Sequence, residues 1–291
     1  MSKRGWNLFI ALCIIWGLPY LLIKVAIRQV DPATLVFLRT APVALLLIPW
    51  CAATDRLRPL RGTLWWIATY AAVEFGIPWL LMGRAEERLT SSMTALMVAA
   101  VPIVAAILFR ITHPEERLGA RRITGLAVGA LGVGLVVGLS IGGSSTIGVL
   151  EMCVVVLGYA LGPLIISTRL AGLPGPGVVA VSVAMVSVAY LPYGVSHLPK
   201  SPTVETVLAI AVLAFVCTAG GFLALIALTR EVGPARATVV TYVNPAVAIG
   251  LGILILGDPL TLGMVLGLPT IIVGSILATS ARTPRSSEPR A

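Results

Sequence analysis

Three ionisable side chains stand inside long apolar stretches of the sequence: Lys24, Arg39 and Glu74. Charged groups are costly in a hydrocarbon environment, so their presence there indicates a function or a paired partner. A carboxyl such as Glu74 could carry a proton or bind a solute amine, whereas the guanidinium of Arg39 stays charged. We expect Arg39 and Glu74 to form an ion pair or a gate. Lys24 is expected to extend toward the membrane surface.

Aromatic and amide side chains stand near glycines and prolines that loosen or bend helices. A bent helix frees backbone groups, which then need an environment lined by protein or water. Rings and amides at such places could line a cavity for an organic solute. The expected cavity residues are Trp16, Tyr20, Glu74, Tyr159, Tyr242 and Asn244. The alternative for each aromatic residue is ordinary packing or anchoring at the membrane surface.

The sequence lacks the motifs of enzymes and nucleotide-driven pumps. It contains no G-x-x-x-x-G-K-[ST], no G-x-S-x-G and no H-E-x-x-H. Its four cysteines form no CxxC pair, so they predict neither a disulfide framework nor a metal site. The net charge of +9 is spread over short loops, which argues against binding of nucleic acid. We therefore expect no enzyme, no cofactor and no metal.

The composition is that of an integral membrane protein with an all-α fold. Of the 291 residues 58% are hydrophobic and 11% charged, against about 25% charged residues in a soluble protein. A helix needs about 20 apolar residues to cross the hydrocarbon core. This rule predicts ten transmembrane helices, near residues 6–27, 33–53, 63–83, 90–110, 121–139, 147–168, 176–196, 205–228, 235–256 and 260–280.

The positive charges predict the orientation of these spans. If the N-terminus is cytoplasmic, 15 Lys and Arg fall on the inside and 4 on the outside. This imbalance follows the rule that short cytoplasmic loops are rich in Lys and Arg. We expect an inner or plasma membrane protein with both termini in the cytoplasm, ending in a polar tail at residues 281–291. Because both ends lie on one side, the number of spans must be even.

Two halves of the chain share a layout. Residues 88–102 resemble residues 231–245, and each segment ends on a proline, Pro102 and Pro245. Further matching pairs are also 142 or 143 residues apart. The halves are expected at 6–139 and 147–280, with five helices each. Since five is odd, the second half must enter the membrane inverted, an arrangement that recurs in secondary transporters.

These residues resemble the drug/metabolite transporter superfamily, specifically its ten-helix EamA-type members. The resemblance rests on Trp16-Gly17, Phe37-Leu38-Arg39, residues 85–102, residues 116–132 and residues 258–274. It implies a cavity between the halves, lined by spans 1, 3, 4, 6, 8 and 9, and movement of amino acids, metabolites or drugs, often by export. The sequence departs from the family at Asp258-Pro259, where Glu and a polar residue are usual, and at Glu74.

The resulting hypothesis is a secondary transporter that exports a small solute, with Glu74 as the residue that could couple export to protons. Its partners would be a small-molecule substrate, the lipid bilayer and protons. Small-xxx-small glycine spacing near residues 125–138 and 263–267 favours close helix contact, within the chain or in a homodimer. The alternatives are a lipid or polyprenyl-phosphate flippase on the same fold and a non-transporting membrane scaffold.

Overall fold

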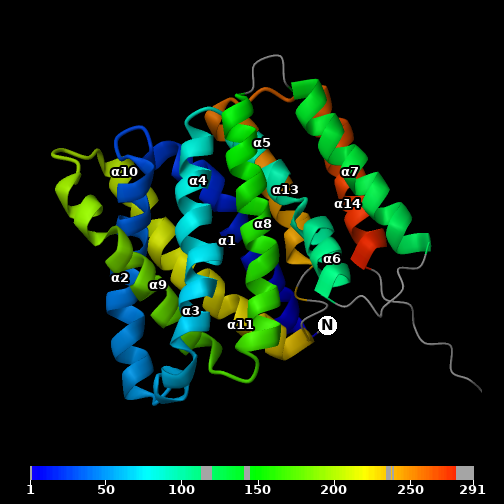
Figure 1. The fold of residues 1–291 in the computed structure, drawn as a ribbon. Coiled ribbons are helices and arrows are strands. Elements are labelled where there is room, and N and C mark those ends of the chain that lie inside the picture. The colour runs from blue at the N-terminus through cyan, green and yellow to red at the C-terminus, as the bar shows by residue number, and fades with distance from the viewer. Residues whose placement is uncertain (1, 113–119, 141–144, 234–236, 238, 280–291) are drawn as a thin grey trace, which may run out of the picture.

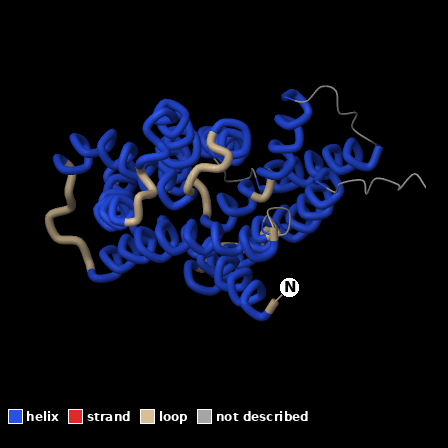
Figure 2. Tube along the Cα trace, turned by 90° about the horizontal axis from the view of Figure 1, so that it is seen from below, coloured by secondary structure: helices blue, strands red, loops and turns tan. Residues whose placement is uncertain are grey.

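The computed structural model describes residues 2–279, except 113–119, 141–144, 234–236 and 238. The described chain consists of helices joined by short loops and contains no strand, which confirms the all-α prediction for this part (Figure 2). The Glu116-Arg117-Leu118 segment and the predicted tail at 281–291 lie outside the described residues.

The first half begins with two uninterrupted helices, α1 (Lys3–Ala26) and α2 (Pro32–Ala53). The next helical stretch has four parts: η1 (Arg58–Thr63), α3 (Leu64–Ala71), η2 (Ala72–Gly76) and α4 (Ile77–Glu86). After a short turn follow α5 (Ser91–Val98), α6 (Val101–Thr112) and α7 (Ala120–Ser140).

The second half repeats this order. It begins with α8 (Thr146–Arg169) and α9 (Gly175–Ser196). A composite stretch follows, made of α10 (Val204–Ala211), η3 (Val212–Gly220) and α11 (Gly221–Val232). The described chain then continues through α13 (Val240–Leu251), η4 (Gly252–Leu256) and α14 (Leu262–Thr279).

Seven helical stretches in the described residues are long and apolar enough to cross a membrane. Three more apolar helices are shorter, at Ile123–Val136, Val240–Leu256 and Leu262–Leu277. These lengths and compositions are those of a membrane protein with many spans. The count of ten spans stays a prediction, because only seven of the described stretches meet both the length and the hydropathy expected of a membrane span.

The helices pack in pairs that agree with an internal two-fold relation. α2 packs on α9 and α7 on α14, so each of these pairs joins equivalent helices of the two halves. The contact between α1 and α13 is equivalent to the contact between α8 and α6. In the same way, the contact between α4 and α8 is equivalent to the contact between α11 and α1. In Figure 1, α1 begins at the lower end of the bundle and α8 at the upper end. The two helices therefore run in opposite directions.

The described chain contains three widened π-helical turns, η2, η3 and η4, and two of them, η2 and η3, lie at equivalent places in the two halves. η2 lies in the third helical stretch and η3 in the eighth, about one repeat length apart in sequence. A π turn shifts the register of every later side chain and leaves backbone groups less regularly paired, and such turns are frequent at functional sites. Glu74 is in η2 and Thr218 is in η3.

The pair α7 and α14, side by side at one edge of Figure 1, is held together by glycines. A Cβ added at Gly132 would lie 2.7 Å from the backbone nitrogen of Ile271, and one at Gly274 would lie 2.5 Å from the Cα of Gly129. Two backbones can approach this closely only where side chains are missing. The close contact is therefore made within the chain, with Gly129 as one of the glycines of the predicted spacing, whereas a Cβ at Gly134 or Gly138 would meet nothing within 4 Å.

A substitution on α7 tests this packing. Gly132→Ala should lower the thermal unfolding midpoint of the purified protein in detergent, because the new methyl group meets the α14 backbone and overpacking costs about 1–3 kcal/mol. Gly134→Ala is the matched control, since a Cβ there has no neighbour within 4 Å. The control should be neutral or stabilising by about 1 kcal/mol, through helix propensity. Equal effects of the two substitutions would contradict the packing.

Candidate functional site

Arg39 of α2 is buried between helices, with 6% of its surface exposed. Its Nε donates a hydrogen bond of 2.8 Å to Oγ1 of Thr218 in η3. Its Cζ lies 3.6 Å from the ring centroid of Trp79 in α4, in a cation–π contact. One guanidinium thus connects α2, η3 and α4.

An uninterrupted series of aromatic rings leads from α1 to Arg39. Trp16 packs edge-on against Phe222, Phe222 against Phe75, and Phe75 against Trp79, with centroids 5.6, 5.0 and 5.1 Å apart. The indole nitrogen of Trp16 donates to the carbonyl of Cys217 at 3.3 Å. Trp16, which the sequence predicted as a cavity residue, therefore belongs to the same cluster as the ring under Arg39.

Glu74 points toward α8. Its Oε2 is buried without a hydrogen-bond partner, and a Cβ placed at Gly162 would collide with that oxygen. No ion pair joins Glu74 to Arg39 in the described chain, which corrects the predicted pairing. The reason is geometric: Arg39 uses Thr218 and Trp79, while Glu74 is directed at the surface that Gly162 leaves open.

Tyr20 and Tyr159 lie near these charged groups. Tyr20 is buried, with 6% exposed, and Tyr159 is half-buried. Both phenols lie within electrostatic range of Arg39, and Tyr159 is also within range of Glu74. The structure thus brings five predicted residues into one region: Trp16, Tyr20, Arg39, Glu74 and Tyr159.

Tyr242 and Asn244 lie on α13, where they face other helices. The hydroxyl of Tyr242 donates to the carbonyl of Ser275 in α14 at 3.5 Å. Asn244 is 9% exposed, its Oδ1 has no hydrogen-bond partner in the described chain, and its backbone adjoins Gly17 of α1. Their place in a solute cavity stays a prediction.

Sequence reasoning missed Glu86, the last residue of α4. It is completely buried, and neither carboxylate oxygen has a hydrogen-bond partner among the described residues. Lys24 donates to the backbone carbonyls of Glu86 and Leu89, so it ties α1 to the end of α4 and does not extend to the surface as predicted. In the sequence Glu86 stands in a charged run typical of a loop, which gave no signal of burial.

Asp258 holds the beginning of α5. Its Oδ2 accepts hydrogen bonds from the hydroxyls of Ser91 and Ser92, at 3.0 and 2.7 Å, and from the backbone nitrogen of Ser92 at 2.9 Å. A carboxylate at this position also meets the positive end of the helix dipole. Gly257 has φ +70, a left-handed conformation that turns the chain back toward α5.

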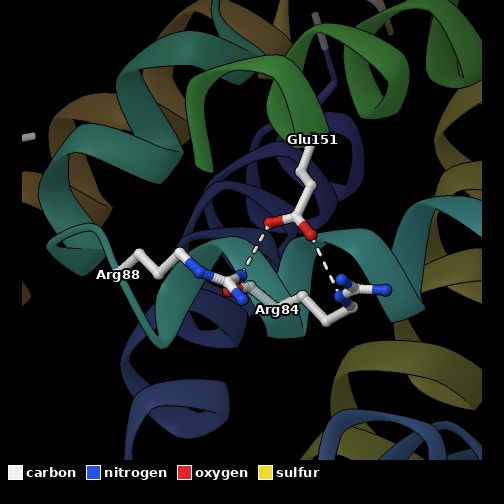
Figure 3. Close-up of polar contacts among 3 residues, drawn as sticks. All are labelled: Arg84, Arg88 and Glu151. Atoms are coloured by element: carbon white, nitrogen blue, oxygen red, sulfur yellow. Dashed lines mark hydrogen bonds and ion pairs between the residues drawn. The ribbon is translucent and has the colours of Figure 1, made fainter. Parts of the chain in front are cut away.

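Glu151 of α8 forms ion pairs with two arginines of the α4 end (Figure 3). Its carboxylate oxygens lie 3.0 Å from Nε of Arg84 and 3.1 Å from a terminal nitrogen of Arg88. Its side chain is only 9% exposed, so the carboxylate is largely shielded from water. This contact joins the first half of the chain to the second.

The family model of EamA-like transporters matches the chain twice, over residues 3–138 and 146–280. The chain belongs to the EamA-like transporter family. It is therefore a membrane protein of a transporter family, built from two copies of the EamA unit.

Similar proteins agree with this assignment. This EamA protein is 26% identical, over 281 residues, to the "Uncharacterized inner membrane transporter YedA" of Escherichia coli strain K12, covering 92% of the chain and 88% of that protein. The same values hold for YedA of Escherichia coli O157:H7. A solved structure described only as "Crystal structure of protein" has a TM-score of 0.66 at 18% identity, covering 96% of this chain and 97% of that chain. That likeness supports the fold alone.

The Glu151 ion pairs give a second prediction. Glu151→Gln should lower the free energy of unfolding by about 1–2 kcal/mol, below the cost for a fully buried pair because both arginines are partly exposed. The control is Asp55→Asn, which breaks the exposed pair of Asp55 with Arg58 at 3.2 Å. That pair should contribute less than about 1 kcal/mol. Chemical unfolding in mixed micelles measures the free energy of unfolding of both variants. Similar decreases in this free energy would show that the Glu151 ion pairs stabilise the protein no more than the exposed pair does.

Proposed function

We propose that this EamA protein is a secondary transporter that exports a small organic solute and uses Glu74 as its proton-coupling residue. The observation that carries the proposal is the state of Glu74: a half-buried side chain in a π-helical turn whose Oε2 is buried and unpartnered in the described chain. An ionisable group in a membrane interior indicates function unless it is paired. No basic residue of the described chain forms an ion pair with this carboxyl, which leaves it available to exchange a proton or a solute cation.

The arrangement of the halves supports alternating access. We propose halves at 6–139 and 147–280 with inverted orientation and with both termini in the cytoplasm. In support, helix contacts occur in equivalent pairs, and α1 and α8 run in opposite directions. Two similar packings of inverted halves could exchange with little difference in free energy, which would expose a central site to each side in turn.

A flippase on the same fold is less well supported. One observation favours it: an open groove of about 370 Å³ lies between α1, α10 and η4 and is lined mainly by leucine and other apolar side chains. Its single cation, Arg28, is balanced by Glu205, so the groove offers a lipid phosphate no excess positive charge. The central region around Arg39 is instead lined by aromatic rings.

Substitution of Glu74 tests the proposal. Everted membrane vesicles with an acidic lumen are incubated with a panel of metabolites, and accumulation is measured by mass spectrometry. Glu74→Gln keeps the shape of the side chain but removes titration, so proton-driven accumulation should be abolished while exchange of solute across the membrane without a gradient continues. Glu205→Gln, an exposed carboxylate on α10, should behave like the parent protein. Unchanged accumulation by the Glu74 variant would make Glu74 structural.

A further inference from the structure

The guanidinium of Arg39 is buried without a counter-charge. Among the described residues, three ion pairs are formed, and each of them involves other arginines: Arg58, Arg84 and Arg88. A buried charge without a partner costs several kcal/mol of stability. The titratable groups in electrostatic range of Arg39 are Tyr20, Tyr159 and Cys217, all neutral in their ordinary state at neutral pH.

The known contacts of Arg39 leave part of its donor edge unused. A guanidinium carries five N–H donors in a planar fork. Thr218 accepts from Nε, and Trp79 covers one face of the plane. In the described chain neither terminal nitrogen has an acceptor, although a structural arginine in an apolar core would be expected to satisfy most of its donors. The contacts with Thr218 and Trp79 therefore fix the orientation of the fork and leave its outer edge available.

We propose that Arg39 binds the anionic group of the transported solute, and that this solute is an organic carboxylate. A carboxylate matches the planar fork with two parallel hydrogen bonds. One cation balances one negative charge, whereas a phosphate monoester carries nearly two at neutral pH. The half-buried rings of Trp16 and Phe222, which continue the series from Trp79 through the fully buried Phe75, would take the apolar part of such a solute. This inference rests on the proposed transport function and adds the substrate class.

The test measures binding without transport. The purified full chain is heated in detergent with matched pairs of acid and amide: acetate and acetamide, phenylacetate and phenylacetamide, indole-3-acetate and indole-3-acetamide. A ligand that binds only the folded protein raises its unfolding midpoint. At least one acid should raise the midpoint by several degrees more than its amide, which has the same shape but no charge. Equal shifts within every pair, or no shift by any acid, would overturn the proposal.

Substitutions assign the effect to Arg39. Arg39→Gln should abolish the difference between acid and amide. Arg39→Lys keeps the charge but loses the fork, so the difference should shrink and not vanish. Arg58→Gln, at a side chain 78% exposed, is the control and should keep the full difference. If Arg39→Gln does not fold, the lysine variant decides: an unchanged preference for the acid would contradict the proposal. Because no gradient is involved, a negative result here leaves the proton-coupling role of Glu74 to be tested separately.

Discussion

The cost of a charge in an apolar interior is the constraint that organises this structure. Most buried or partly buried charges have a partner from another segment. Lys24 has the carbonyls at the end of α4, Asp258 has the beginning of α5, and Glu151 has two arginines. Arg39, Glu74 and Glu86 are exceptions, since none of them has an opposite charge bonded to it in the described residues. In our account, Arg39 and Glu74 are the charges of this group whose partners arrive during transport.

The conformation of the backbone positions Arg39 and Glu74. η2 carries Glu74 and η3 carries Thr218, which orients Arg39, and the two π-helical turns occupy equivalent positions in the two EamA units. The missing side chain of Gly162 leaves room on α8 for the Glu74 carboxyl. The same repeated element thus serves different purposes in the two halves: one copy holds a carboxyl and the other positions a cation. A symmetric fold can in this way produce a site that is chemically asymmetric.

Composition and apolar stretches predicted the all-α membrane fold, and the repeat and the motifs indicated the family. Trp16, Tyr20 and Tyr159, which were predicted to line a cavity, lie near Arg39 in the structure, while their role in a cavity stays a prediction. The predicted ion pair of Arg39 with Glu74 was wrong, since Arg39 bonds to distant Thr218 and Glu74 is directed at Gly162, and local sequence does not show such distant contacts. The burial of Glu86 depends on contacts with a distant segment, so local sequence gave no sign of it.

A double-mutant cycle between the two central charges tests this account most directly. Arg39→Met, Glu74→Gln and the double variant are unfolded in mixed micelles, and the interaction free energy is taken from the four proteins. Residues that share no contact are usually additive within about 0.5 kcal/mol, whereas contacting pairs are coupled by about 0.5–3 kcal/mol. We predict additivity, because Arg39 and Glu74 are held apart for ligands. A favourable coupling above about 1.5 kcal/mol, on the same scale, would show that the two charges are partners of each other and would contradict the account.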